Sequence, residues 1–397
     1  MAELLGLAEA QALVLERAQL LGAERVQIAT AGGRYLADDA RALVDLPPFP
    51  SSAMDGYALR ATDTPGRLPV TARIAAGLPA GRALGAGEAM AIATGGVVPN
   101  GGDAVVPVEY VVEYDNEVEV PDSVVQGANV RPRGGDVRAG DVVVAAGTRL
   151  GPAHIGALGA AGVDSVVCGR ATRVSIVATG TELRPPGTPL APGQVYEANG
   201  AMLAAALAAA GAEVRRHEAV ADDEEAHRRV LIEALGADIV VTSGGVSVGP
   251  HDLVRAVLTD LGVEEVFWGV AVKPGKPISF GMRGRTLVFG LPGNPVSSLV
   301  GCELFVRPAV RALQGASEPG PLYEVGRLGD SARRNAKRDE FLRARRRVTD
   351  DGVVLVPVRG QESHMIVRAA GADALIYVPR GEGELRDGER VRYLPLV

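Results

Sequence analysis

The sequence predicts a protein of several domains, of mixed α/β and all-β class. Its 397 residues correspond to between two and four domains at roughly 150 residues each. Between residues 174 and 313 strand-like runs alternate with glycine-rich loops and helical patterns, which is typical of a parallel sheet. Short β-like runs between Pro and Gly turns lie on both sides of that region. Hydrophobic residues make up 47% of the chain, enough to bury several cores.

The N-terminal part predicts a helix, a linker and a β-rich domain. Residues 4–21 repeat apolar side chains at spacings of three and four, so we expect an amphipathic helix ended by Gly22. It contains acids and lacks the basic start of a signal peptide. Short β-like runs fill residues 46–139, which we assign to a β-rich domain. We assign residues 1–45 with 140–170 to the N-terminal helix and a linker domain.

The next region, residues 171–316, predicts a doubly wound α/β domain. Ligands of such sheets bind at the carboxyl ends of the strands. The predicted strands lie at 174–179, 213–220, 238–242 and 286–289, and the helices at 202–210, 224–235, 252–261 and 296–313. Residues 317–397 alternate in short strands and predict a small separate β domain.

Charge and composition exclude several classes of protein. The 41 basic and 48 acidic residues give a net charge of −7, and aromatic residues are only 4%. That balance argues against a nucleic-acid partner. No apolar run is long enough to cross a membrane. Two cysteines and five histidines without metal-ligand spacing argue against a disulfide framework or a zinc site, and predict a reducing, cytoplasmic location.

Three glycine-bearing loops of the predicted α/β domain suit an anionic ligand. They are residues 179–182 (TGTE), 243–245 (SGG) and 291–295 (LPGNP), each between a strand and a helix. Free N–H groups beside glycines can hold phosphate. None of the loops has a Walker or dinucleotide-binding pattern, so we expect a different phosphorylated ligand.

Charged side chains near these loops have two interpretations each. Lys273 and Lys276 could bind phosphate or an oxyanion, or be solvated surface lysines. Four carboxylates follow strand ends and suit Mg²⁺ or the N–H edge of a heterocycle: Glu182, Asp222, Asp223 and Asp252. Asp252 could instead favour a helix dipole. The basic run 333–347 most simply predicts a solvated strand face.

The β-rich region carries its own candidate site. The stretch 47–57 is Pro-rich and unusually apolar for a surface loop, and it ends near Asp55. A second glycine loop begins at Thr94. Arg131 and Arg133 precede Asp136, and guanidinium groups suit bidentate binding of an oxyanion.

Six motifs in a fixed order carry a family resemblance. They are SAMDGY at 52–57, ATGG at 93–96, RGGD at 133–136, SGGVSVG at 243–249, KPGKP at 273–277 and GLPGNPV at 290–296. In this combination the chain resembles the molybdopterin molybdenumtransferases, the MoeA family, whose eukaryotic relative is the gephyrin E domain. The resemblance runs from the first helix to the last strand.

The resemblance implies a fold and an activity. The fold would be four domains: a MogA-like α/β domain, a β-rich domain, a linker domain and a small β-barrel-like C-terminal domain. Members form elongated homodimers whose active cleft lies between the α/β domain of one subunit and the β-rich domain of the other. They insert molybdate into adenylylated molybdopterin and release AMP, with Mg²⁺ as the usual cation. The dithiolene sulfurs of the substrate hold the molybdenum.

The resemblance also implies roles for single residues. Asp55, Thr94, Asp136, Glu182 and Asp252 match catalytic positions. Positions that bind substrate or phosphate are Ser243, Gly244, Gly245, Asp222, Lys273, Lys276, Pro292, Gly293, Asn294 and Pro295. Those for molybdate are Arg131, Lys273, Arg343 and Ser363, and those for Mg²⁺ are Glu182, Asp222 and Asp252. Asp223 is an alternative to Asp222. Relatives often have a basic residue where this chain has Gly269, so Lys276 or an arginine would have to replace that charge.

Two other functions remain as alternatives. A MogA-type adenylyltransferase shares the SGG and PGNP loops, but residues 1–170 and 317–397 exceed what that single domain needs. A gephyrin-like scaffold without enzymatic activity is the other. For the transferase itself, a MogA-type adenylyltransferase and molybdoenzyme maturation factors are the expected partners beside the second subunit.

Overall fold

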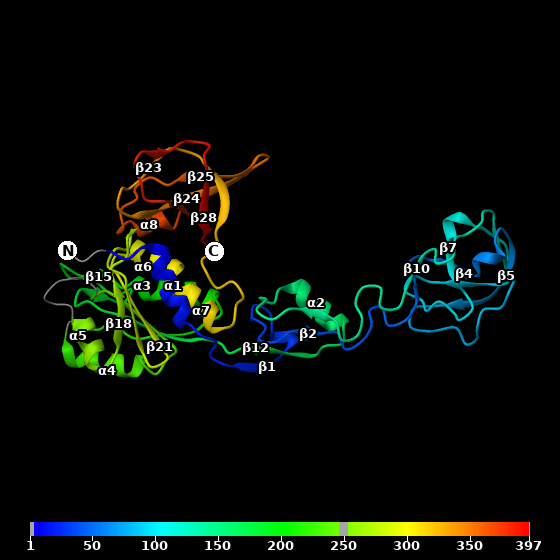
Figure 1. Cartoon of the computed structure of the whole chain (residues 1–397), viewed down its shortest axis with the longest axis horizontal. Coiled ribbons are helices and arrows are strands. Elements are labelled where there is room, and N and C mark those ends of the chain that lie inside the picture. Colours follow the sequence, from blue (N-terminus) through cyan, green and yellow to red (C-terminus); the bar gives the residue numbers. More distant parts are fainter. Residues whose placement is uncertain (1–3, 222, 246–252, 397) are drawn as a thin grey trace.

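The computed structural model describes residues 4–221, 223–245 and 253–396 (Figure 1). The chain is elongated. The α/β domain and the C-terminal β domain lie together at one end, the linker in the middle and the β-rich domain at the other end (Figure 1). The predicted class, a multi-domain protein of mixed α/β and β content, is confirmed.

The α/β domain is built on one six-stranded sheet. Its order is β16-β13-β17-β21-β20-β18. The first four strands are parallel, as predicted, and the last two form an antiparallel edge that the sequence analysis did not predict. The strands are β13 (Arg173–Ala178), β16 (Glu213–Arg216), β17 (Ile239–Ser243), β18 (Glu264–Trp268), β20 (Ser279–Arg283) and β21 (Thr286–Leu291).

Helices cover both faces of this sheet because neighbouring residues of a buried strand point to opposite sides. On β13, Ile176 belongs to the larger apolar core and Val177 to the smaller one. Residues of α3, α6 and α7 contribute to the first core, and residues of α4 and α5 to the second. The helices are α3 (Asn199–Ala209), α4 (Glu224–Ala234), α5 (Leu253–Asp260), α6 (Pro295–Gly301) and α7 (Arg307–Leu313). A π-helical turn, Cys302–Val306, separates the last two.

The N-terminal helix α1 (Leu7–Arg17) packs on the α/β domain, although the sequence analysis grouped it with the linker. Its buried residues Leu7, Ala10 and Val14 belong to the same core as Phe305 of the π-helical turn. The reason is its spacing: an apolar stripe at three- and four-residue intervals needs an apolar face to cover, and the outer surface of α7 supplies one. The other domain boundaries stay predictions.

Two separated stretches of the chain form the linker. β1 (Ala23–Gln27) pairs antiparallel with β12 (Ser165–Gly169), and β2 (Ala40–Arg41) pairs with β11 (Val142–Val144). The helix α2 (Pro152–Ala160) packs against them. The chain therefore leaves the α/β end, passes through the linker to the β-rich domain, and returns.

The β-rich domain has a second six-stranded sheet, in the order β7-β4-β6-β5-β9-β8. All neighbours are antiparallel except β5 and β6. The strands are β4 (Gly56–Leu59), β5 (Gly66–Ile74), β6 (Ala89–Ile92), β7 (Ala104–Pro107), β8 (Val112–Glu113) and β9 (Glu117–Val120).

The C-terminal domain contains a closed barrel of five strands, in agreement with the predicted barrel-like fold. The order β24-β25-β22-β28-β26 closes because β26 also pairs with β24. These strands are β22 (Glu324–Leu328), β24 (Asp339–Thr349), β25 (Gly352–Pro357), β26 (Ala374–Val378) and β28 (Arg390–Pro395). A short helix, α8 (Ile366–Ala369), and the pair β23 (Ala332–Arg333) and β27 (Glu384–Leu385) complete it.

One strand joins the barrel to the α/β domain. β19 (Val272–Lys273), between β18 and β20 in the chain, pairs parallel with the start of β24. Within residues 4–221, 223–245 and 253–396, no helix combines the length and apolarity that crossing a bilayer requires.

Candidate active site

A cavity of about 820 Å³ lies at the carboxyl ends of the central strands of the α/β domain. The register of the sheet sets Ala178, Ser243 and Leu291 level with one another, so the three loops that follow begin side by side. The cavity is lined by Glu182, Ser243, Gly244, Gly245, Pro292, Gly293, Asn294 and Pro295. The structure thus brings these sequence-predicted residues together at the sheet edge where ligands of parallel sheets bind.

Glycines are required where two of these loops meet. Gly244 has a φ of +96°, and a Cβ there would lie 2.6 Å from the carbonyl oxygen of Thr179. At Gly245, with a φ of +64°, a Cβ would lie 2.5 Å from a methyl group of Val254. Any side chain would therefore push the SGG loop away from the TGTE loop and open the floor of the cavity.

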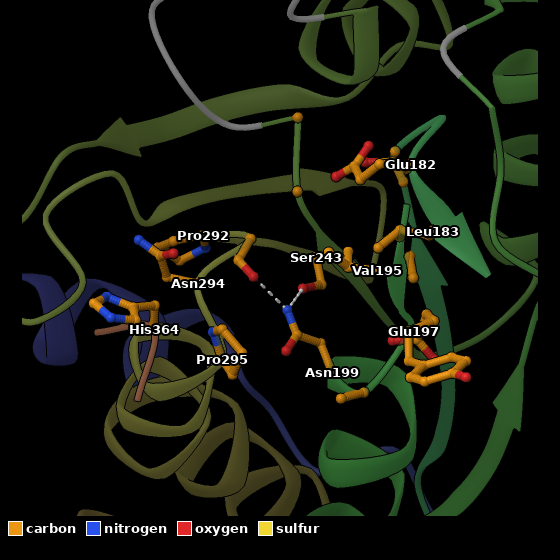
Figure 2. A pocket seen from close by; sticks show the side chains of 18 of the residues that line it. Glu182, Leu183, Val195, Glu197, Asn199, Ser243, Pro292, Asn294, Pro295 and His364 are labelled. Carbon is orange, nitrogen blue, oxygen red and sulfur yellow. Dashed lines mark hydrogen bonds between the residues drawn. The ribbon is translucent and has the colours of Figure 1, made fainter. Parts of the chain in front are cut away.

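Asn199, which the sequence analysis did not select, connects two of the loops. Its amide Nδ2 donates to Ser243 Oγ at 2.9 Å and to the carbonyl oxygen of Gly293 at 2.7 Å (Figure 2). Ser298 adds a further link by donating to the carbonyl oxygen of Pro292. The position of Asn199, at the start of a helix after a short strand pair, is the signal that could have identified it. That pair is β14 (Leu183–Arg184) and β15 (Val195–Tyr196).

Few of the described side chains that line the cavity carry a charge without an ion-pair or hydrogen-bond partner. Glu197 is buried, and its carboxylate accepts from the Gly200 N–H at 2.6 Å and from Arg216 at 3.0 Å, so it has a structural role. Within the part of the chain that the structure describes, the side chains of Glu182 and His364 line the cavity without a hydrogen-bond or ion-pair partner. His364 reaches the cavity from the C-terminal domain, and the sequence analysis missed it.

The two predicted anion-binding lysines do not line this cavity; Pro277, which follows them, does. Lys273 Nζ lies 2.8 Å from Glu340 Oε1 of the barrel, in an ion pair beside the β19–β24 pairing. Lys276 is exposed. Gly269 has a φ of +88°, so it supplies a backbone conformation that a basic residue would adopt only with strain.

Arg343, which the family resemblance assigns to molybdate, lies inside the barrel domain, and its role toward molybdate stays a prediction. Its side chain is 0% exposed. The guanidinium donates to the carbonyl oxygens of Gly360 and Met365, both at 2.7 Å, and of Glu362 at 3.2 Å. Burial lowers the pKa of Arg343. Enclosed by these carbonyl groups, the guanidinium holds the segment 360–365 in place.

Ser363, the second weakly aligned molybdate residue, belongs to that segment. Its carbonyl oxygen accepts from the Val296 N–H at 3.1 Å, which joins the barrel to the start of α6. Ser363 is half-buried, next to the cavity-lining His364. Whether its hydroxyl contacts an oxyanion stays a prediction.

A second cluster of predicted residues lies in the β-rich domain. Asp55 Oδ1 accepts from the Thr94 N–H at 2.7 Å and from Thr94 Oγ1 at 3.0 Å, which keeps the pKa of Asp55 below its usual range. Asp55 borders a hollow of about 320 Å³, which Arg73 and Glu113 also line.

The motif strands around this cluster are held together. β3 (Ser51–Ser52) pairs with β10 (Val130–Arg131), and Ser52 exchanges backbone hydrogen bonds with Gly95 and Gly96. The exposed Arg131 therefore lies on the strand beside the one that leads to Asp55, and the exposed Asp136 follows it in the chain. Within one chain, the β-rich domain that carries this cluster and the α/β domain that carries the cavity lie at opposite ends of the molecule (Figure 1).

Of the three residues predicted to bind Mg²⁺, the structure describes only Glu182. Asp222 and Asp252, the other two, lie outside the described residues. Across residues 4–221, 223–245 and 253–396 no group of three or more His, Cys, Asp or Glu could hold a metal ion. Asp223, the alternative to Asp222, caps α4 by accepting from the Ala226 N–H at 2.8 Å. The Mg²⁺ site stays a prediction.

Known proteins match this architecture along its whole length. Residues 5–162 match the MoeA N-terminal region (domains I and II), residues 175–312 a probable molybdopterin binding domain, and residues 325–396 the MoeA C-terminal region (domain IV). Molybdopterin molybdenumtransferase 2 of Mycobacterium tuberculosis is 36% identical, over 97% of this chain and 98% of its own. The chain belongs to the molybdopterin molybdenumtransferase family.

Other members of the family agree. Molybdopterin molybdenumtransferase of Haemophilus influenzae is 33% identical, over 94% of this chain and 93% of its own. The crystal structure of a molybdopterin biosynthesis MoeA protein from Pyrococcus horikoshii OT3 has a TM-score of 0.86 at 28% identity, and covers 99% of this chain and 100% of its own. The family resemblance in the sequence is therefore confirmed.

Proposed function

We propose that this chain is a transferase that inserts molybdenum from molybdate into adenylylated molybdopterin and releases AMP. The observation that carries the proposal is the similarity to molybdopterin molybdenumtransferases over almost the whole chain. The cavity at the carboxyl edge of the α/β sheet supports it, because about 820 Å³ lies within the range of pockets that enclose small organic ligands.

The chemistry that the cavity offers fits a substrate which brings its own metal ligands. The dithiolene sulfurs of molybdopterin would bind the molybdenum, so the protein needs no cysteine for it. Both cysteines are buried, and burial raises the pKa of each thiol, which disfavours the thiolate that a metal would need. The chain's task would be to hold the pterin and its phosphate against the glycine loops while the phosphoanhydride-type bond to AMP breaks.

Mg²⁺ would be held by Glu182 together with Asp222 and Asp252. The unpartnered carboxylate of Glu182 at the cavity fits such a ligand set, within the described residues. When bound, the ion would neutralise negative charge on the phosphate. Glu182 could alternatively accept a hydrogen bond from the N–H edge of the heterocycle.

We further propose a cytoplasmic homodimer in which the active cleft is shared. The α/β domain with the cavity and the β-rich domain with Asp55 lie at opposite ends of one chain (Figure 1), so a second copy would have to bring an Asp55 to each cavity. Because the substrate is adenylylated, a MogA-type adenylyltransferase is the expected supplier, and molybdoenzyme maturation factors would take the product.

The test is a reconstituted reaction. Purified chain given adenylylated molybdopterin, molybdate and Mg²⁺ should release AMP, and omission of molybdate should suppress the release. In a second reaction the chain is given ATP and free molybdopterin. Formation of adenylylated molybdopterin in that reaction would favour the alternative function, a MogA-type adenylyltransferase. Folded protein that releases no AMP would contradict the proposal.

A further inference from the structure

The α/β cavity would have to bind an anionic substrate although few positively charged side chains line it. Among the described residues that line it there is no lysine and no arginine. Lys273 is paired with Glu340, and Lys276 lies outside the lining. In that same set of residues His364 is the one side chain that can become a cation as well as donate an N–H.

His364 is well placed for such a contact. It lies beside Asn294 and Pro295 at the wall formed by the PGNP loop (Figure 2). The bond from the Val296 N–H to the carbonyl oxygen of Ser363, at 3.1 Å, fixes the neighbouring residue against the same loop. The imidazole itself is exposed, with no partner among the described residues, so its nitrogen atoms are free for a ligand.

The segment that carries His364 is held from inside the barrel. Arg343 donates to three of its carbonyl oxygens, and the Gln361 side chain accepts from the Arg343 N–H at 3.0 Å and donates to the Arg343 carbonyl oxygen at 2.9 Å. These bonds lie on both sides of His364 in the chain. The backbone that carries His364 is therefore already fixed, so that a ligand has to order only the imidazole side chain.

We infer that His364 binds the phosphate of the substrate, so that the C-terminal barrel domain contributes a substrate-binding residue to the α/β cavity. The inference rests on the proposed function and names a contact within it. Arg343 does not contact the substrate itself; it is a positioning residue that holds the segment carrying His364. The ligand class is a phosphate ester of a nucleotide or pterin, which would accept a hydrogen bond from the imidazole.

Calorimetric titration of the full-length chain with AMP tests the contact. His364→Ala should weaken AMP binding by about tenfold, the scale of one lost hydrogen bond to a charged group. His364→Gln keeps an N–H donor but cannot become a cation, so its affinity for AMP should lie between that of His364→Ala and that of the unmodified chain. Arg359→Gln is the matched control: it removes a positive charge from a neighbouring exposed residue outside the cavity lining, and should leave binding unchanged.

Each outcome decides the inference. AMP binding by His364→Ala that equals the unmodified chain would overturn it. An equal weakening in Arg359→Gln would also overturn it, because a general field rather than a contact would then be responsible. Turnover of the unmodified chain, measured in parallel, separates the proposed transferase function from the proposed His364 contact. If both the unmodified chain and His364→Ala release AMP with the same KM for adenylylated molybdopterin, only the His364 contact is wrong. If the unmodified chain neither binds nor releases AMP, both are wrong.

Discussion

The two ends of the chain each carry a hollow lined by predicted site residues, and the two hollows differ. The α/β cavity is large and bounded by loops that neutral groups such as Asn199 hold together, and its described lining contains few free charges. The Asp55 hollow in the β-rich domain is smaller, at about 320 Å³, and has a carboxylate fixed by two hydrogen bonds. One end supplies volume, and the other supplies a positioned charge.

Sheet architecture explains this difference. Parallel strands end at the same edge, so the loops after β13, β17 and β21 gather there and enclose a cavity. In the β-rich sheet, strands that lie next to each other are antiparallel except β5 and β6, so the loops that follow adjacent strands mostly leave from opposite ends of the sheet and are not gathered side by side. Such a domain can fix a side chain but does not readily enclose a substrate.

The largest expected effect comes from removing the positioned charge. Asp55→Asn should slow AMP release by about a hundredfold, as loss of one positioned polar group at a reacting centre does, and leave the melting temperature unchanged. The side chain is exposed, so little stability depends on it. Steady-state rates and thermal melting measure both. A normal rate would show that the β-rich end is not part of the site.

Mixing two inactive variants tests whether the ends meet across a dimer. Glu182→Gln alters the cavity and Asp55→Asn the other end, so a mixed dimer would contain one intact site. Equal amounts refolded together should regain roughly a quarter of the unmodified activity, since half of the dimers are mixed and each has one of two sites intact. Activity no higher than that of the separate variants would contradict a shared cleft.

Arg343→Met tests the support of the cavity wall. It removes the guanidinium donor from the carbonyl oxygens of Gly360, Glu362 and Met365, of which the last two keep a backbone donor, so we expect a loss of about 3 kcal/mol in the free energy of unfolding of the C-terminal domain. Urea denaturation measures it. Arg345→Met, an exposed neighbour on β24, is the control and should change stability far less.

Asn199→Ala should have a smaller effect that is confined to the cavity. It removes the donor to Ser243 Oγ and to the Gly293 carbonyl oxygen, worth about 1 kcal/mol each, so AMP should bind up to about thirtyfold more weakly. Asn116→Ala removes an exposed amide of the β-rich domain, outside the cavity lining, and is the control that should leave the affinity for AMP unchanged. Equal affinities for Asn199→Ala and the unmodified chain would mean that the loops hold their places without this link.

The smallest expected change is a shift in titration. Thr94→Val removes the hydroxyl donor to Asp55 and keeps the stronger backbone donor, so the pKa of Asp55 should rise but remain below its ordinary value of 3.8. The contribution of Asp55 to stability is present above that ordinary value and disappears as the pH falls through the folded-state pKa; the variant should lose it at a slightly higher pH. Carboxyl NMR titration measures the shift, and an unchanged pKa would show that the hydroxyl bond is absent in solution.

Local patterns in the sequence predicted where the loops of the cavity lie. The SGG and PGNP loops are glycine-bearing turns after apolar strands, and the register of the sheet does bring them together. The patterns misplaced Arg343, because the basic run 333–347 alternates along a strand and nothing in it marks one residue as facing inward. They missed Asn199 and His364 for a related reason: each acts on a loop that is distant in the chain.

The sequence by itself determined the alternation of strands and helices, the glycine positions that the tight loops need and the family of the chain. These depend on residue type and spacing over a few neighbours. Only the tertiary structure decided that α1 covers the α/β domain, that Arg343 faces carbonyl groups rather than solvent, and that a barrel residue reaches the cavity. Those outcomes depend on which distant surfaces pack together, and packing is settled by the burial of whole faces rather than by any local pattern.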